Sequence, residues 1–455
     1  MLSETIFYRL MQWPKAGRYW IAFSGGADSQ SLLSALVEMR RSHNIEISAV
    51  HVDHQISSLS KDWVKHCRWV CQRLRVPLMV KKVSLESLGN VEEEARRLRY
   101  RAIESIMSEG DIVLTGHTAE DQAETVLLQM LRGSGPAGLA AMPELKRFGL
   151  GWHGRPMLNI PRKHVREYVQ GSNVVDDPSN EDVAYDRNFL RNNVYPMLRD
   201  RWPGVTKTLT RVAKLQAENR RLLYYLASVD LKVCGTDRNT LRIKELLALD
   251  QPRRLNVIRY WIEKNKLRAM TRAQLISVHD LIIAADDSRG VVTWNHESIR
   301  CYDGHLHIVG QLDPVGVESG RQWKLEYTAG LAHGCLCAFR TVAGGLAADL
   351  ESAEIAIRYR LGGERCRPSY RGHSQTLKKL FQEAKVPPWW RSRIPLLYIR
   401  DELAAVGSLW VCAPFYAPPG EPAWQISWTD VADKSLESQK EIACSAEDFV
   451  SPKDD

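Results

Sequence analysis

Ile21-Ala22-Phe23-Ser24-Gly25-Gly26-Ala27-Asp28-Ser29 is the stretch that decides the fold of the N-terminal part of the chain. The apolar run 19–23 predicts a buried strand, and apolar residues recur at helical spacing over 32–37. Two glycines separate these patterns. A strand, a glycine turn and a helix N-terminus together form an anion site, because the unpaired helix N–H groups and the helix dipole point at the ligand.

A plainer interpretation of this stretch is a strand-to-helix turn in which serine and aspartate only cap the helix. A bare Gly-Gly pair would leave both interpretations open, whereas Ser24 before the glycines and Asp28-Ser29 after them favour the anion site. The stretch resembles the PP-loop of ATP pyrophosphatases, which split ATP into AMP and pyrophosphate. It is not a Walker A loop, because it contains no lysine.

Length and composition are typical of a soluble protein with several domains. A chain of 455 residues predicts roughly two to four domains, and contents of 25% charged and 44% hydrophobic residues are ordinary. The net charge of +8 permits a nucleic-acid partner without requiring one. The N-terminal residues lack the pattern of a signal peptide, and no apolar run reaches about 18 residues, so we expect a cytoplasmic protein that does not associate with membranes.

The nine cysteines indicate neither a disulfide framework nor a metal centre. Cys67 and Cys71 lie four residues apart on a predicted helix, and Cys335 and Cys337 alternate along a predicted strand. Neither pair has the CxxC spacing of a zinc or iron–sulfur site. We therefore expect reduced, mostly buried thiols.

Residues 19–132 repeat a strand-then-helix pattern, which predicts an α/β fold with a doubly wound parallel sheet. The predicted strands are 19–23, 45–53, 76–83 and 111–115, and the later helices are 61–75, 91–108 and 119–132. Ligands of such sheets bind at the carboxyl ends of the strands. Three polar clusters follow strand ends, namely the loop 24–29, His51-Val-Asp53-His54 and Gly116-His117. Each could be an ordinary loop, but their shared position predicts one crevice.

The densest polar cluster, residues 115–125, follows the fourth strand. Asp121, Glu124 and Thr125 have the spacing of one side of a helix start. A capped helix with acids at its positive end explains the acids but not the neighbouring His117. Two carboxylates at this place could hold magnesium on ATP phosphates or accept a proton from an attacking amine.

Two segments after this helix carry further patterns. Gly133 to Gly138 matches GxGxxG formally, but it follows a helix and contains Pro136, so we reject a dinucleotide fingerprint and expect a flexible loop. The segment 176–196 reads as a turn leading into a helix. Its Arg187 and Arg191 lie four residues apart on one face, where like charges repel unless they bind an anion such as a phosphate or nucleic acid.

The rest of the chain combines helices with a basic C-terminal module. Residues 205–285 read as helical, with basic residues among Tyr and Trp, which suits RNA or an amphipathic bundle equally. Asp303-Gly304 predicts a hairpin turn, and 355–412 predicts strands around a helix. Between residues 358 and 393 ten Lys and Arg face only two acids, which favours nucleic-acid binding. The polar stretch after residue 430 predicts disorder.

Taken together, these motifs resemble the tRNA(Ile)-lysidine synthetase family. The segments SGGADS, HVDH, EEEARRLRY, GHTAEDQAET, RGSGPAGLAAM and DPSN…YDRNFLRNNVYPML occur in the family's order. RYRLGGERCRP and LKKLFQEAKVPPWWRSRIPLLY are similar to its C-terminal domain. Between about 205 and 350 the match is one of length and helical character.

The resemblance implies a domain order and a reaction. Residues 1–204 would form a PP-loop domain of the adenine nucleotide alpha hydrolase type. Residues 205–345 would form a mainly helical tRNA-binding domain, 346–430 a small basic α+β tRNA-binding domain, and 431–455 a disordered tail. The enzyme would be an ATP-dependent C–N ligase. ATP would adenylate the C2 oxygen of cytidine 34 in the CAU anticodon of tRNA(Ile), and free L-lysine would displace AMP to give lysidine.

The resemblance also implies residue roles. Ser24, Gly25, Gly26, Ala27, Asp28 and Ser29 would bind ATP, and Asp28, Asp121 and Arg191 would be catalytic. Asp28 or Asp121 would hold Mg²⁺. Substrate and tRNA would contact His117, Arg132, Arg187, Arg191, Arg365, Lys378 and Lys379. A homodimer is left open.

The chain departs from the family pattern at Glu120, where a second aspartate is common, and at Gln55, where a glycine follows HVDH. The first change keeps a carboxylate, and the second alters the loop beside the crevice. Two other functions compete with the synthetase. A PP-loop tRNA sulfurtransferase commonly needs reactive cysteine pairs, and this chain has no CxxC. A non-catalytic RNA-binding protein would not need an intact loop with Asp121.

Overall fold

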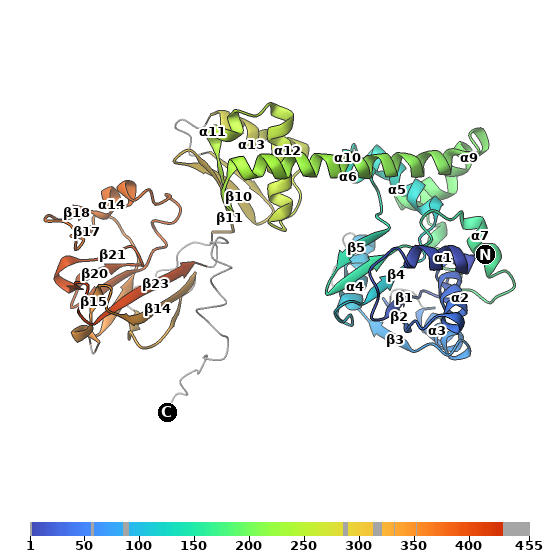
Figure 1. Cartoon of the computed structure of the whole chain (residues 1–455), viewed down its shortest axis with the longest axis horizontal. Coiled ribbons are helices and arrows are strands. Elements are labelled where there is room, and N and C mark those ends of the chain that lie inside the picture. Colours follow the sequence, from blue (N-terminus) through green and yellow to red (C-terminus); the bar gives the residue numbers. More distant parts are fainter. Residues whose placement is uncertain are drawn as a thin grey trace. The chain divides into compact units, whose positions relative to one another are not determined.

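The computed structural model describes residues 2–55, 59–84, 91–284, 290–312, 321–331, 333–351 and 353–430. The predicted disordered tail, 431–455, lies outside these residues. The chain divides into two compact units, Met1–Leu222 and Leu223–Asp455 (Figure 1). The long helix α10 (Val205–Cys234) begins in the first unit and ends in the second. The domain boundaries predicted near residues 204, 345 and 430 remain predictions.

The first unit contains a six-stranded mixed sheet with the order β3-β2-β1-β4-β6-β5. The strands β1 (Tyr19–Ala22), β2 (Ile47–Asp53), β3 (Leu78–Lys82) and β4 (Ile112–Leu114) run parallel, as predicted. Sequence reasoning missed a hairpin at one edge, in which β5 (Leu145–Phe148) is antiparallel to β6 (Gly151–Gly154). These strands are four residues long, and β5 carries Lys146 and Arg147, so no apolar run marks them.

Helices cover both faces of this sheet, which makes it doubly wound (Figure 1). Tyr19 and Ile21 pack into one core with residues of α1 (Leu2–Leu10), α2 (Ala27–Ser42), α3 (Ser60–Arg73) and α7 (Arg162–Tyr168). Trp20, which lies between them in sequence, packs into the opposite core with Ile103 of α4 (Val91–Glu104). This alternation is the period of two expected of a strand, and it leaves the carboxyl end of the sheet open for a ligand.

A helical segment packs against α5 (Ala119–Leu131) beside this open end. It comprises a 3₁₀ turn (Pro178–Glu181), α8 (Asp186–Phe189), a π-helical turn (Leu190–Val194) and α9 (Tyr195–Arg201). Leu190 and Tyr195 bury against Ala123 and Leu127 of α5. The expected flexible loop after α5 is corrected in part, because residues 136–139 form a short helix, α6 (Pro136–Leu139), which Pro136 can begin without losing a hydrogen bond.

After α10 the second unit contains a small α+β module, and two short strands within 235–242 interrupt the region 205–285 that was expected to be helical. A five-stranded antiparallel sheet has the order β7-β8-β11-β10-β9. Its elements are β7 (Gly235–Asp237), β8 (Thr240–Arg242), α11 (Ile243–Leu247), α12 (Gln251–Lys264), α13 (Arg272–Ile283), β9 (Val291–Trp294), β10 (Glu297–Tyr302) and β11 (His305–Val309). The predicted hairpin is confirmed: Tyr302 pairs with His305, and Asp303 and Gly304 have φ of +47° and +72°, as a type I′ turn requires.

The C-terminal part of this unit contains two five-stranded sheets with a shared core that includes Trp323, Leu336, Leu397 and Trp424. The predicted helix is α14 (Leu377–Glu383), whose Leu377, Leu380 and Phe381 are buried. The strands are β12 (Arg321–Trp323), β13 (Ala329–Leu331), β14 (Gly334–Thr341), β15 (Gly345–Ala347), β16 (Ile355–Arg358), β17 (Arg365–Cys366), β18 (Gln375–Thr376), β19 (Leu396–Ile399), β20 (Glu402–Val406), β21 (Trp410–Val411), β22 (Tyr416–Ala417) and β23 (Ala423–Asp430). In the described part of the chain, no helix has the length and apolar character to cross a membrane.

Candidate active site

A cavity of about 630 Å³ opens at the carboxyl ends of β1, β2 and β4. This is the place where parallel α/β sheets bind their ligands. Its lining comes from six stretches, which lie within 22–29, 50–55, 60–63, 95–103, 115–121 and 175–191. The three polar clusters predicted to meet at one crevice therefore do so.

The loop Ser24–Ser29 leads into the N-terminus of α2 and lines the cavity. Gly25 has φ of +87°, a conformation that glycine adopts without strain. The Ser29 hydroxyl donates to the Gly26 carbonyl at 2.9 Å and lies 3.1 Å from the Ser24 hydroxyl. No side chain caps the helix at Gly26, so the N–H groups of its first turn are available to an anion.

Gly116 packs directly against this loop. A Cβ at this position would lie 2.7 Å from the backbone oxygen of Asp28, a distance that only glycine avoids. We expect Gly116→Ala to push the loop away, lowering the free energy of unfolding by about 1–3 kcal/mol and weakening ATP binding. Urea unfolding and an ATP titration measure the two effects. Gly204→Ala is the matched control because a Cβ there meets no atom within 4 Å, and equal behaviour of the two variants would refute the argument.

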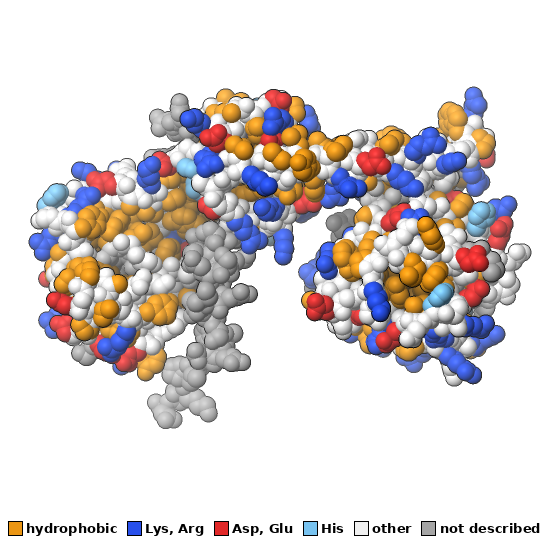
Figure 2. Space-filling model, in the orientation of Figure 1, with side chains coloured by type: hydrophobic (Ala, Val, Ile, Leu, Met, Phe, Trp, Pro, Cys, Tyr) orange, Lys and Arg blue, Asp and Glu red, His pale blue; other side chains and the backbone are white. Residues whose placement is uncertain are grey.

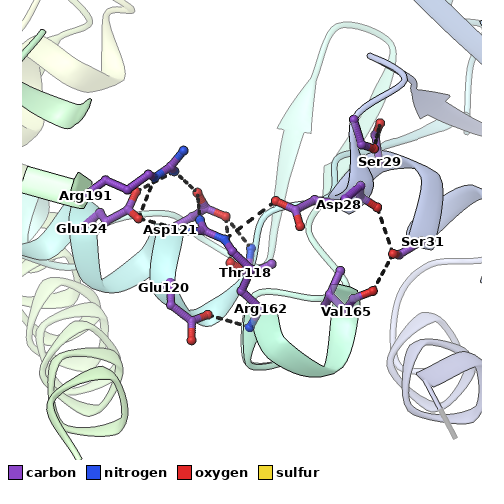
Figure 3. Close-up of polar contacts among 12 residues, drawn as sticks. Asp28, Ser29, Ser31, Thr118, Glu120, Asp121, Glu124, Arg162, Val165 and Arg191 are labelled. Atoms are coloured by element: carbon purple, nitrogen blue, oxygen red, sulfur yellow. Dashed lines mark hydrogen bonds and ion pairs between the residues drawn. The ribbon is translucent and has the colours of Figure 1, made fainter. Parts of the chain in front are cut away.

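Two buried carboxylates on α5 lie beside the loop and are joined to arginines from two other elements (Figure 3). Asp121 Oδ2 accepts from the Thr118 N–H and hydroxyl at 2.8 and 2.9 Å, which caps the helix. Asp121 Oδ1 accepts from Arg162 at 2.8 Å and from Arg191 at 2.7 Å. Glu124 accepts two hydrogen bonds from Arg191, at 2.9 and 2.7 Å. The acids and arginines thus form one buried network.

Arg187 and Asp28 lie at the edges of this network. Arg187 comes within 3.4 Å of Asp121 and 3.6 Å of Glu124. Asp28 Oδ2 lies 3.8 Å from Arg162, while its buried Oδ1 has no hydrogen-bond partner among the described residues. Burial raises the pKa of Asp28, an effect that Arg162 only partly offsets. Burial also acts to raise the pKa of Asp121, but Arg162, Arg187 and Arg191 outweigh it and hold that pKa below its usual range.

Comparison with known proteins assigns this architecture. Three family models match the chain: a PP-loop domain over residues 3–198, a TilS substrate binding domain over 241–307 and a TilS substrate C-terminal domain over 355–428. The tRNA(Ile)-lysidine synthase of Coxiella burnetii is 36% identical over 415 residues, which cover 90% of this chain and 92% of that protein. The chain belongs to the tRNA(Ile)-lysidine synthase family. The enzymes of this name from Methylococcus capsulatus (36% identity, 90% and 96% coverage) and Legionella pneumophila (34%, 94% and 98%) are similar over nearly the same span.

Membership of the tRNA(Ile)-lysidine synthase family makes this chain an ATP-dependent tRNA-modifying ligase, as the resemblance implied. The sulfurtransferase and non-catalytic alternatives are set aside. Cys67 and Cys71 agree with this outcome, because burial raises the pKa of each to about 12, where a thiol is not nucleophilic at neutral pH.

Several predicted residues line the cavity of this lysidine synthase, and others do not. Asp28, His117, Asp121, Arg187 and Arg191 line it together with the loop serines. Arg132 does not; it is exposed and forms an ion pair with Asp186 at 3.7 Å. Three predicted tRNA contacts, Arg365, Lys378 and Lys379, belong to the second unit, where all three are exposed.

Sequence reasoning missed Arg162, the most highly connected arginine of the network. It contacts Asp28, Asp121 and Glu124, and its backbone N–H donates to Glu120 at 2.7 Å. Its only local signal is a basic turn after Pro161 at the start of α7. Nothing in the sequence indicates that this turn folds onto acids some 40 positions earlier. Glu124 belongs to the cluster whose carboxylates were considered for magnesium or proton transfer, but it was not among the predicted site residues.

The strand-end residues of β2 also line the cavity. His51 Nδ1 lies 2.9 Å from the Phe23 carbonyl, and Asp53 accepts from the Gln55 N–H at 2.9 Å. Gln55, which stands where the family commonly has glycine, has φ of +55°. This left-handed conformation favours glycine, and this chain adopts it with a glutamine whose backbone N–H donates to Asp53.

Proposed function

We propose that the cavity at the end of the N-terminal sheet carries out both steps of lysidine formation. The observation that supports this most strongly is the network in which Asp121 and Glu124 meet three arginines beside the phosphate-binding loop. In the first step the loop Ser24–Ser29 binds ATP, and the C2 oxygen of cytidine 34 attacks the α-phosphorus as pyrophosphate leaves. In the second step the lysine ε-amine attacks C2, and AMP leaves.

The charge pattern of the network suits free L-lysine, which carries two ammonium groups and one carboxylate. Acids accept hydrogen bonds from ammonium groups, and arginine binds carboxylates in a two-pronged geometry. Asp28 is the acid that we assign to the attacking amine, since its Oδ1 has no hydrogen-bond partner in the described residues. Arg187, at the network's edge, and Arg191, within it, both line the cavity, where they can stabilise phosphate charge.

A magnesium ion fits Asp28 better than Asp121. Mg²⁺ in nucleotide sites is commonly held by one or two carboxylates together with substrate phosphates. Asp28 offers a free oxygen beside the phosphate loop, whereas both oxygens of Asp121 already accept hydrogen bonds. Among the described residues no group of three or more His, Cys, Asp or Glu forms a metal centre, so most ligands would come from ATP and water. The ion would neutralise phosphate charge.

The tRNA is assigned to basic surfaces outside the cavity. Lys207, Arg211, Lys214 and Arg221 are exposed along α10, where Figure 2 shows basic side chains on the visible face. Arg365, Lys378 and Lys379 would add contacts in the C-terminal module, and Arg132 in the N-terminal one. Such contacts bind phosphates and make binding dependent on salt. The CAU anticodon as the recognised element, a cytoplasmic location and a homodimer stay predictions.

Mass spectrometry of tRNA nucleosides tests the proposed reaction directly. After incubation of tRNA(Ile) bearing a CAU anticodon with the protein, ATP and lysine, we expect one cytidine to gain the mass of lysine less water. Omitting either lysine or ATP is the control and should abolish the gain. An unmodified cytidine in the complete reaction would refute the proposal.

A further inference from the structure

A relay of four hydrogen-bonded side chains, Arg155, His153, Thr115 and His117, runs from the protein interior to the cavity wall. Arg155 Nη2 lies 3.3 Å from His153 Nδ1, His153 Nε2 lies 2.9 Å from the Thr115 hydroxyl, and that hydroxyl lies 2.8 Å from His117 Nδ1. The Thr115 N–H also donates to the Gly154 carbonyl at 3.1 Å, which ties β6 to the end of β4. None of the roles proposed above uses Arg155 or His153.

Arginine sets the direction of every hydrogen bond in this relay. A guanidinium has only donors, so His153 Nδ1 accepts and carries no proton. A neutral imidazole then carries its proton on Nε2, which donates to the Thr115 oxygen. The Thr115 hydroxyl has no third partner among the described residues, so its proton goes to His117 Nδ1. His117 therefore carries its own proton on Nε2.

The reverse direction is not chemically accessible. If His117 Nδ1 donated to Thr115 and Thr115 donated to His153 Nε2, both nitrogens of His153 would lack a proton, and the ring would be an imidazolate. A doubly protonated His153 would instead direct an N–H at Arg155. Burial, followed by the positive charge of Arg155, lowers the pKa of His153 to about 2. Burial also lowers the pKa of His117 to about 3: the Asp121 carboxylate acts to raise it, and the positive charges of Arg155, Arg187 and Arg96 act with burial.

His117 lines the cavity, and its second ring nitrogen, Nε2, is available to a ligand. Its Nε2 has no hydrogen-bond partner in the described part of the chain, whereas Nδ1 is engaged. The preceding Gly116 touches the Asp28 backbone, so His117 stands next to the phosphate-binding loop. A neutral donor in this position cannot give up or take a proton near neutral pH, but it can stabilise negative charge that develops on an oxygen.

We propose that Arg155 and His153 are positioning residues which act through Thr115 to hold His117 as a neutral imidazole protonated on Nε2, ready to donate a hydrogen bond to an oxygen of the reacting centre. This inference rests on the proposed function for the identity of that centre. The acceptor is an oxygen of the α-phosphoryl group of ATP or the C2 oxygen of cytidine. These two groups react with each other during adenylation.

Nitrogen NMR of the histidine rings tests the relay without any assay of activity. Long-range ¹H–¹⁵N spectra distinguish the Nε2–H tautomer from the Nδ1–H tautomer and from imidazolium. The His117 signals among the 13 histidines are assigned by their loss in His117→Gln. In the wild type we expect a neutral Nε2–H ring between about pH 5 and 8. An Nδ1–H ring or an imidazolium in that range overturns the proposal.

Three substitutions test the hydrogen bond of Arg155 separately from its charge. Arg155→Met removes the obligate donor and is expected to populate the Nδ1–H tautomer of His117. Lys146→Met is the matched control, because the charge of Lys146 also lowers the pKa of His153 but no hydrogen bond joins these side chains. Thr115→Val interrupts the relay with nearly the same volume. An unchanged His117 tautomer in both Arg155→Met and Thr115→Val contradicts the relay.

Kinetics then identify the acceptor. We expect His117→Ala to lower kcat for tRNA-dependent pyrophosphate release by about 100-fold, and His117→Gln, which keeps an N–H, to lose much less. The first substrate is ATP with sulfur at a non-bridging α-position: if it slows pyrophosphate release in the wild type but not in His117→Ala, the acceptor is the phosphate oxygen. The second substrate is tRNA with 2-thiocytidine at position 34: if the same comparison shows a slowing that depends on His117, the acceptor is the C2 oxygen. No His117-dependent effect with either substrate overturns the donor role. A wild type that releases no pyrophosphate refutes the proposed function instead, while the ring spectra still test the relay.

Discussion

Replacing Asp28 with asparagine is expected to lower lysine- and tRNA-dependent pyrophosphate release by about 1,000-fold, with no loss of stability. Asp28 lies in the phosphate-binding loop, and its buried Oδ1 has no hydrogen-bond partner among the described residues. In the proposed mechanism the Asp28 carboxylate contacts the lysine amine and would hold magnesium. An asparagine keeps the shape but carries no negative charge, so it loses both interactions.

The stability half of this prediction follows from the direction of the Asp28 pKa. Burial raises that pKa in the folded protein, so the ionised carboxylate is less stable there than in the unfolded chain. Its ion-pair contact with Arg162, at 3.8 Å, is long. At pH 7 we therefore expect the free energy of unfolding of Asp28→Asn to equal or exceed that of the wild type, as measured by urea unfolding.

Asp200→Asn is the matched control for Asp28→Asn. Asp200 is an exposed aspartate on α9 that does not line the cavity, so the control should keep both activity and stability. Two results would contradict the argument. Activity within tenfold of the wild type would remove Asp28 from the chemistry, and a large loss of stability would show that Asp28 supports the fold.

The features that the sequence predicted well are those carried by local patterns. The run 19–23, the glycines after it and the apolar spacing over 32–37 predict β1, the loop and α2, because each depends on neighbours within a few residues. Asp121 was found for the same reason, since it lies three residues after Thr118 in a capping box. The turn at Asp303-Gly304 likewise needs only the two residues that form it.

The features that were missed depend on packing between distant segments. Arg162 meets Asp121 only because α7 packs against α2 and turns its first residue toward α5. His153 meets Thr115 only because an edge hairpin joins the sheet beside β4. The sequence around Arg162 and around His153 does not indicate the partner of either residue, because a polar or charged residue on a short strand or turn is usually solvated. The network and the relay are therefore properties of the fold and became visible with it.

Replacing Asp121 with asparagine, in contrast to Asp28, is expected to lower both activity and stability. Asp121 is 6% exposed and neutralises Arg162 and Arg191, so its loss leaves buried positive charge that only Glu124 and the more distant Asp28 can balance. We expect a loss of about 3 kcal/mol in the free energy of unfolding at pH 7. Glu167→Gln is the control: it breaks an exposed ion pair with Lys163 and should have no measurable effect.

The same loss should depend on pH in a defined direction. The pKa of Asp121 is depressed in the folded protein, so its contribution is fully present above the unfolded pKa of about 4 and falls as pH drops toward the folded value. The stability difference between wild type and Asp121→Asn should therefore be constant from pH 7 to 5 and shrink below pH 4. Urea unfolding at several pH values measures it. A difference that persists unchanged at low pH would mean that Asp121 stabilises α5 as a helix cap rather than as a charge.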